Sequence, residues 1–195
     1  MGYRERDDYL SASILNSMLR EDSTEELIDI LKERIVAVVG AGPSLSEIRG
    51  FQEERIVAAD GASRYLREIG IEPHVIVTDL DGIERADRAF YVVHAHGDNQ
   101  QLLWKVEEMK KVVGTCQVSP FGRLRVFGGF TDGDRALALA LYAGARKVNL
   151  YGMDFDSEFV GKYSKPGLTD HIPASAAKRA KLAIGKRITE HLLGT

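Results

Sequence analysis

Residues 75–82 read VIVTDLDG, an apolar run that ends in two aspartates one residue apart, Asp79 and Asp81. A short run that is apolar throughout is typical of a strand covered on both faces, as in the parallel sheet of an α/β protein. Ligands of such proteins bind at the carboxyl ends of the strands. The two aspartates are therefore candidate metal or phosphate ligands.

A solvated turn is the simplest alternative for this pair, because Asp-Gly is a common turn sequence. Two carboxylates at the end of a buried strand repel each other unless a cation or a proton lies between them. Mg²⁺ is the natural cation, since it binds hard oxygen ligands and is commonly held by one or two carboxylates together with substrate phosphates. Asp98, in the cluster HAHGDN after another apolar run, could complete the site.

Short apolar runs alternate with helical segments along the rest of the chain. This alternation predicts an α/β fold with a doubly wound, largely parallel sheet. The predicted strands are 35–39, 55–59, 75–78, 89–93, 111–117 and 147–151, and the predicted helices are 44–49, 62–69, 99–110, 132–143 and 174–193. The glycine-rich segment 118–130 is predicted to be a loop that could move over a ligand.

Two further helices are predicted before the first strand, over residues 7–20 and 23–34, and Ser23 and Glu26 resemble a capping box at the start of the second. Residues 1–34 are accordingly expected to form an N-terminal helical layer on the core. Residues 35–195 are expected to form the α/β catalytic domain, with both parts making one compact unit.

The composition excludes several classes of protein. The net charge of −3 does not favour general nucleic-acid binding. No apolar run approaches the roughly 18 residues of a membrane span, and the first residues lack the apolar core of a signal peptide, so a cytoplasmic protein without a membrane partner is expected. The single cysteine, Cys116, cannot form an internal disulfide and is most simply a buried apolar residue.

The first predicted strand is followed by GAGPSL, a candidate nucleotide loop that contains Gly40, Gly42, Pro43 and Ser44. Glycines let a backbone approach a ligand closely, and Pro43 and Ser44 suit the first turn of a helix whose free N–H groups could bind phosphate. The loop lacks the third glycine of a dinucleotide fingerprint and the Gly-Lys-Ser/Thr of a P-loop. A plain tight turn explains it equally well.

Other strand ends carry further candidates, and a shared acidic pocket is the expected result. Asp60 and Gly61 end the second strand, where Asp60 either caps the next helix, binds a ligand, or does both. Thr131 and Asp132 open a predicted helix and could instead contact the second substrate or metal-bound water. Asp154 lies beside two aromatic residues and could bind a flat heterocycle.

Two further clusters of residues each have a simple structural explanation and a functional one. His94 and His96 with Asp98 could imitate a transition-metal site, although hydrogen bonding to phosphate or to the carboxylates is favoured. Five basic residues near the carboxyl terminus fit either a solvated helix face or a polyphosphate contact; they are Lys162, Lys165, Lys178, Arg179 and Lys181.

At these residues the chain resembles the archaeal 6-hydroxymethyl-7,8-dihydropterin pyrophosphokinases, which are related in fold to thiamin pyrophosphokinase. The matching elements run in the family's order across about two thirds of the chain. They are GAGPSL (40–45), ADGA (59–62), VTDLDG (77–82), HAHGDN (94–99), GFTDGDRA (129–136) and YGMDF (151–155). The resemblance implies a Rossmann-like fold similar to the thiamin pyrophosphokinase catalytic domain.

The resemblance also implies Mg²⁺-dependent transfer of diphosphate from ATP to the hydroxymethyl group of a reduced pterin, in folate or methanopterin synthesis. Asp79, Asp81 and Asp98 would be the metal or phosphate-site residues, and GAGPSL a nucleotide loop. The expected partners are the two small-molecule substrates, and a homodimer is left open.

Three other functions compete with this one. Thiamin pyrophosphokinases are similar at ADGA and TDLDG, but Ser63, Thr78 and Gly82 replace the residues that they tend to carry. A haloacid-dehalogenase-like phosphatase would use D-L-D-G as its nucleophile motif, yet the downstream lysine and second acidic motif are missing. A non-catalytic nucleotide-binding module would use the acidic residues only for turns and caps.

Overall fold

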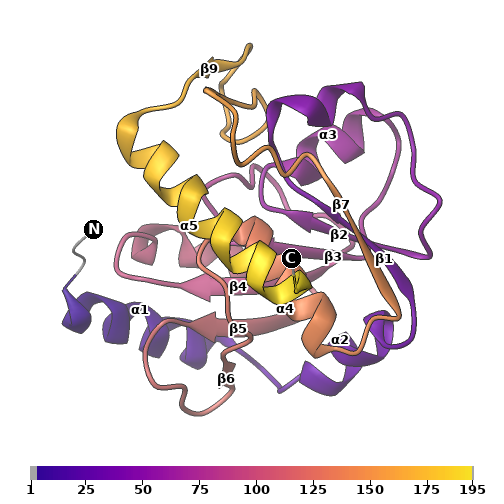
Figure 1. The fold of residues 1–195 in the computed structure, drawn as a ribbon. Helices are drawn as coiled ribbons and strands as arrows, with labels where there is room; N and C mark the ends of the chain where they lie inside the picture. Colours follow the sequence, from indigo (N-terminus) through magenta and orange to yellow (C-terminus); the bar gives the residue numbers. More distant parts are fainter. Residues whose placement is uncertain (1–3, 195) are drawn as a thin grey trace.

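The structure is a computed structural model that describes residues 4–194, and its centre is a seven-stranded parallel sheet (Figure 1). The strand order is β6-β5-β4-β3-β2-β1-β7. The strands are β1 (Ile35–Val39), β2 (Arg55–Ala59), β3 (Val75–Thr78), β4 (Phe90–Ala95), β5 (Val112–Cys116), β6 (Leu124–Arg125) and β7 (Lys147–Tyr151). The predicted α/β fold with a doubly wound, parallel sheet is confirmed.

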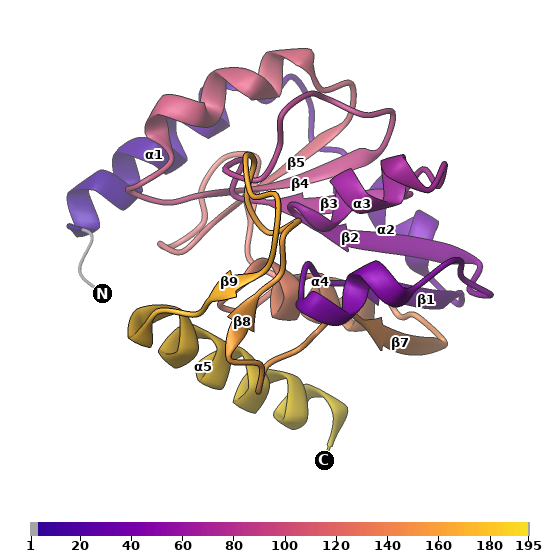
Figure 2. The same cartoon turned by 90° about the horizontal axis from the view of Figure 1, so that it is seen from above.

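Helices cover both faces of this sheet (Figure 2). One face is covered by α1 (Glu5–Met18), α3 (Ala62–Glu68) and two 3₁₀ helices, η1 (Pro43–Glu47) and η2 (Gln100–Glu108). The other face is covered by α2 (Thr24–Leu31) and α4 (Asp132–Tyr142), and α5 (Ala176–Leu193) packs outside α4. The two N-terminal helices thus lie on opposite faces.

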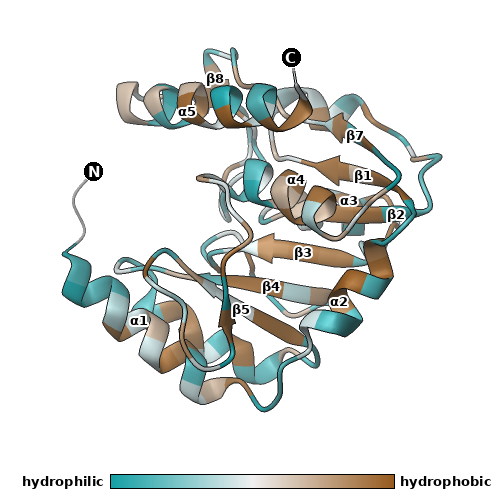
Figure 3. Ribbon diagram, turned by 60° about the horizontal axis from the view of Figure 1, so that its bottom comes forward, coloured by the Kyte–Doolittle hydropathy of each residue, from teal (hydrophilic) through white to brown (hydrophobic). Residues whose placement is uncertain are grey.

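The central strands β1 and β3 are almost wholly apolar because both of their faces are buried (Figure 3). The edge strand β7 is more exposed and carries Lys147 and Asn149. In β3, Val75 and Val77 pack with the α4 side, whereas Ile76 packs with the α1 side. Successive side chains of a strand point to opposite faces, so a strand between two helical layers needs apolar residues at every position.

Three short strands were not predicted. One is β6, which lies within the segment expected to be a loop, and the others are β8 (Phe159–Val160) and β9 (Ile172–Pro173), which pair antiparallel. Each has only two residues, too few to show a hydrophobic period. The segment 99–110 was predicted to be helical and forms the 3₁₀ helix η2.

The predicted capping box at Ser23 is wrong. The Ser23 hydroxyl donates to the Glu21 carboxylate at 3.3 Å, and the backbone N–H of Thr24 donates to Asp22 Oδ1 at 3.1 Å. A capping box is found instead at α4, where the buried Asp134 carboxylate accepts from the backbone N–H of Thr131 at 2.7 Å. This bond fixes the start of α4 at the carboxyl edge of the sheet.

Helix α1 is bound to the turn that follows β4. The Ser11 hydroxyl donates to the His96 carbonyl at 2.7 Å, and Asp8 Oδ1 accepts from the Gly97 N–H at 2.7 Å. The first helix therefore positions the HAHGDN turn. Within residues 4–194, no helix has the length and apolar character that crossing a bilayer demands.

Candidate active site

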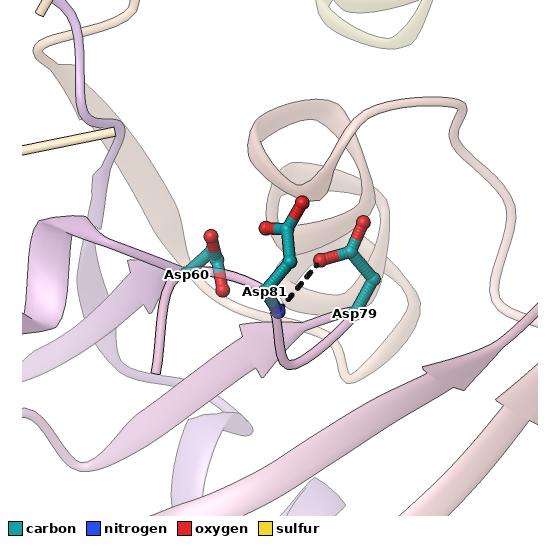
Figure 4. Close-up of side chains that lie close together, drawn as sticks. All are labelled: Asp60, Asp79 and Asp81. Carbon is teal, nitrogen blue, oxygen red and sulfur yellow. Dashed lines mark hydrogen bonds between the residues drawn. The ribbon is translucent and has the colours of Figure 1, made fainter. Parts of the chain in front are cut away.

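Three carboxylates meet where β2 and β3 end side by side (Figure 4). Asp60 follows β2, while Asp79 and Asp81 follow β3. Each offers one oxygen, and these oxygens all lie within 4.8 Å of one another. Neighbouring parallel strands have brought together residues that are about 20 positions apart in the sequence.

Asp60 joins this group rather than capping α3. The N-cap position of α3 is Gly61, and the Asp60 carboxylate turns toward the next loop, where Oδ1 accepts from Thr78 Oγ1 at 2.6 Å and from the Gly82 N–H at 3.1 Å. The prediction that the Asp60 side chain caps this helix, alone or in addition to binding a ligand, is therefore wrong. Its backbone helps the helix differently, since the Asp60 carbonyl accepts from the Ser63 hydroxyl at 2.8 Å.

The backbone of both loops is strained. Asp60 has a φ of 45° and Leu80 a φ of 78°, values that are uncommon for residues other than glycine. Such strain persists only when surrounding structure enforces it, and it is concentrated at functional sites. Gly82 shows how tight the turn is, because a Cβ atom there would lie 1.9 Å from Asp60 Oδ2.

Two side chains from outside the loop enforce this conformation. The Asn99 amide donates to the carbonyls of Asp79 at 2.8 Å and His94 at 2.7 Å. The Lys105 ammonium donates to the carbonyls of Leu80 at 2.8 Å and Ile83 at 2.6 Å. Neither was predicted, and Lys105 belongs to no motif that could have revealed its role.

Positive and hydrogen-bonding groups surround the carboxylates. Lys165 forms an ion pair with Asp81, and His96 Nε2 lies 3.4 Å from Asp79 Oδ2. Asp132, at the first position of α4, adds a fourth carboxylate, and Arg135 Nη1 lies 3.7 Å from its Oδ1. Lys165 comes from the segment after β8, far away in the sequence.

The carboxyl groups titrate unusually because they are crowded. Burial, and next the charges of Asp79 and Asp81, raise the pKa of Asp60 to about 7. Burial and nearby carboxylates also raise the pKa of Asp81 and, more strongly, that of Asp132. Burial alone would raise the pKa of Asp79, but hydrogen bonds from His96 and Asp81 hold it below its usual value.

The group fits a hard divalent cation. Asp81 Oδ1 and Asp132 Oδ1 are buried and make no hydrogen bond with any residue in the described range 4–194. Carboxylate oxygens are the ligands that Mg²⁺ prefers. No second metal-binding group of three is formed by His94, His96 and Asp98 in that range; His94 Nδ1 instead lies 3.0 Å from Thr115 Oγ1.

A pocket lies beside the carboxylates, and candidate site residues from several strand ends line it. Lys165, Lys178 and Leu182 close its other side together with β8. Of the residues predicted to bind nucleotide, the pocket is lined by Gly40, Gly42, Pro43, Asp60, Gly61, Thr131, Asp132 and Asp154. Ser44 lines an adjacent hollow, and Asp98 is exposed on the turn after β4, outside the three-carboxylate group.

The GAGPSL loop is held by the end of β7. The Gly40 and Gly42 N–H groups donate at 2.8 Å to the Tyr151 and Gly152 carbonyls. Both Asp154 oxygens accept from Ser44, one from its N–H and one from its hydroxyl, each at 2.7 Å. These N–H groups are therefore already paired within the protein, and the loop offers the pocket close backbone approach rather than a row of free donors.

The model of the family described as 6-hydroxymethylpterin diphosphokinase MptE-like matches residues 12–158. The chain belongs to this family. Three relatives cover 98% of the chain and 87–89% of their own lengths, and each is described as a 6-hydroxymethyl-7,8-dihydropterin pyrophosphokinase. The proteins of Pyrococcus furiosus, Methanothermobacter thermautotrophicus and Methanocaldococcus jannaschii are 45%, 42% and 38% identical to it.

A solved structure of a MAf glycosyltransferase from Magnetospirillum magneticum is also similar to this MptE-like chain, with a TM-score of 0.48 and 15% identity. It covers 74% of the chain, which spans only 28% of that protein. The family match includes Asp60, Asp79, Asp81 and Asp132. Lys165 and Lys178, which complete the pocket of this MptE-like protein, lie beyond the matched residues.

Proposed function

We propose that this MptE-like protein transfers diphosphate from ATP to the hydroxymethyl group of 6-hydroxymethyl-7,8-dihydropterin, with Mg²⁺ held by Asp60, Asp79 and Asp81. The observation that carries the proposal is the group of three carboxylates beside a pocket lined by the nucleotide-loop residues. The names of its archaeal relatives support the choice of acceptor.

In this reaction the hydroxyl oxygen of the pterin bonds to the β-phosphorus of ATP. The bond from that phosphorus to the α,β-bridging oxygen breaks, AMP leaves with the bridging oxygen, and the hydroxyl proton passes to solvent. Such a transfer needs in-line positioning and charge neutralisation far more than covalent help from the protein. Mg²⁺ held by Asp60, Asp79 and Asp81 would supply part of that neutralisation.

The protein's own residues supply the rest. Lys165 and Lys178 place positive charge in the pocket, where the triphosphate is negative. Burial, and next the charge of Lys165, lowers the pKa of Lys178, and a bound phosphate would oppose that effect. Gly40 and Gly42 let the nucleotide loop pack closely on the end of β7, because a Cβ atom at either position would clash with Met153, Gly152 or Asp154 atoms.

The direct test incubates the purified protein with ATP, Mg²⁺ and 6-hydroxymethyl-7,8-dihydropterin. The expected products are AMP and the pterin diphosphate in equal amounts. Replacing the pterin with thiamin tests the thiamin pyrophosphokinase alternative. Phosphate released from simple esters without ATP would indicate a phosphatase, and the absence of any product would indicate a binding module; either result contradicts the proposal.

The proposal also states which molecules the protein binds. Its substrates are ATP and the reduced pterin, with no role for nucleic acid or a membrane. A homodimer, a cytoplasmic location and the choice between folate and methanopterin synthesis stay predictions.

A further inference from the structure

A second cavity, of about 240 Å³, lies on the α4 face of the sheet. Its lining comes from β3, β4 and β5, from α4, and from the segment that connects β6 to α4. Its apolar walls are Val77, Val92, Val126, Phe127 and Leu139, and its polar side chains are His94, Thr115, Gln117 and Arg135. The proposed nucleotide and metal sites do not use this cavity.

His94 is the unusual group in this cavity. His94 is only 4% exposed, and its Nε2 atom is buried and makes no hydrogen bond of normal geometry among the described residues 4–194, although an interaction with the Gln117 side chain slightly opposes the lowering of the pKa of the ring. Burial, and next the charges of Arg135 and His96, lower the pKa of His94 to about 3, so the ring is neutral at physiological pH. A buried polar atom left unpaired is costly and calls for an explanation.

The hydrogen bonds of the ring indicate which nitrogen carries the hydrogen. Thr115 Oγ1 lies 3.2 Å from the Val93 carbonyl, which can only accept, and we assign the hydroxyl hydrogen to this bond. The same Oγ1 lies 3.0 Å from His94 Nδ1, and we assign it as the acceptor of the Nδ1 hydrogen. With its hydrogen on Nδ1, the neutral ring presents Nε2 to the cavity as an acceptor.

The cavity adjoins the carboxylates from the side opposite the nucleotide pocket. Val93 pairs with Thr78 across β4 and β3, which places His94 beside Asp79 at the strand ends. Arg135 lines the second cavity, and its Nη1 lies 3.7 Å from Asp132, which lines the first. Two substrates held in these two cavities would therefore meet at the carboxylate group.

We propose that this second cavity binds the flat heterocycle of the acceptor alcohol, and that His94 Nε2 accepts a hydrogen bond from one of its N–H groups. The inference rests on the proposed function and names the subsite of the acceptor. A reduced pterin is neutral and flat, with N–H groups on its ring and its exocyclic amine, which suits apolar walls and a deep acceptor. The positive charge of Arg135 on the wall disfavours a cationic acceptor such as thiamin.

The test measures binding of 6-hydroxymethylpterin to the full chain by calorimetry, without nucleotide. His94→Phe keeps the size of the ring and removes the acceptor, and we expect the Kd for the pterin to rise about tenfold or more. His94→Gln, whose amide oxygen can reach the Nε2 position, should restore part of the affinity. The Kd for ATP should stay unchanged in both variants, and His191→Phe, on an exposed face of α5, serves as the matched control.

Thr115→Val provides a second test that leaves His94 in place. It removes the acceptor that keeps the hydrogen on Nδ1, so we expect weaker pterin binding and unchanged ATP binding. A pterin Kd equal to that of the wild type in folded His94→Phe and in Thr115→Val would overturn the inference, even if the wild type produces AMP and the pterin diphosphate. His94-dependent binding of pterin by a protein that makes no AMP would support the subsite and contradict the proposed function.

Discussion

Asp79 and Asp81 are neighbours in the sequence but have different surroundings. Asp79 accepts from the Asp81 N–H at 3.3 Å and lies beside His96, whereas Asp81 Oδ1 makes no hydrogen bond within residues 4–194. The two carboxylates raise each other's electrostatic energy in the absence of a cation. Burial and the charge of Asp79 raise the pKa of Asp81, so the charge of Asp81 costs stability until a cation binds, whereas hydrogen bonds from His96 and Asp81 stabilise the charge of Asp79.

At this scale we predict that Asp79→Asn and Asp81→Asn each lower kcat by about 10²- to 10³-fold, because each removes a charge that holds the metal and phosphates. Without Mg²⁺, the temperature of unfolding should fall in Asp79→Asn, which loses a charge that the fold stabilises, and should not fall in Asp81→Asn, which loses a charge that the fold disfavours. Steady-state kinetics and thermal unfolding measure the two effects. Asp29→Asn, on the exposed side of α2, is the matched control and should change neither.

Residue patterns predicted part of this group. The D-x-D pair was visible because it directly follows an apolar strand. The sequence could not show whether Asp60 joins the carboxylate group or caps a helix, because its position relative to Asp79 depends on the register between β2 and β3. Asp98 was expected among the ligands, but the turn after β4 leaves it exposed.

At the scale of elements, the loop after β3 depends on a side chain from η2. We predict that Lys105→Met, which keeps the stem but removes two hydrogen bonds to the Leu80 and Ile83 carbonyls, lets the loop relax from its strained conformation. Mg²⁺-dependent activity should fall at least about tenfold, with a smaller change in unfolding temperature. Activity equal to that of the wild type would show that the lysine does not hold the loop.

The hydrogen bonds between Asp154, which follows β7, and Ser44 of the GAGPSL loop lead to a second prediction at this scale. Asp154→Ala removes the acceptor for both Ser44 donors, which should lower the free energy of unfolding by about 1 kcal/mol or more. Because the loop lines the pocket, the KM for ATP should rise while the KM for the pterin stays the same. A selective rise in the KM for the pterin would contradict the assignment of the two cavities.

Most elements were predictable because an apolar strand between two helical layers has a clear signature, as in β1 and β3. The partner of the GAGPSL loop was not predictable. Asp154 lies 110 positions from Ser44, and the contact arises only because β7 pairs with β1. A pairing of strands that are distant in the sequence leaves no local signal.

At the scale of the whole molecule, α5 serves the pocket more than the core. Its buried residues are Gly185 and Thr189, yet Lys178 and Leu182 line the nucleotide pocket. We predict that a chain ending at Ala174 keeps a cooperative unfolding transition, because both apolar clusters of the sheet lie in earlier elements. Its Kd for ATP should rise at least about tenfold, and calorimetry against the full chain measures this; loss of cooperative unfolding would contradict it.

The sequence predicted the fold class of the whole molecule but not how the chain encloses two cavities. Strands β1 to β6 follow one another across the sheet, and the chain then returns through α4 to place β7 beside β1 (Figure 1). That return brings Lys165 and Lys178 to one side of the carboxylates and leaves the β6–α4 segment on the other. The arrangement depends on the connection and not on any single motif.

The most direct test of the metal site is the binding of Mn²⁺, standing in for Mg²⁺, in the presence of a non-hydrolysable ATP analogue, measured by electron paramagnetic resonance. The account predicts bound Mn²⁺ in the wild type and in Asp29→Asn, and binding weaker by about tenfold or more in Asp79→Asn and Asp81→Asn. Equal Mn²⁺ affinity in all four proteins would contradict it.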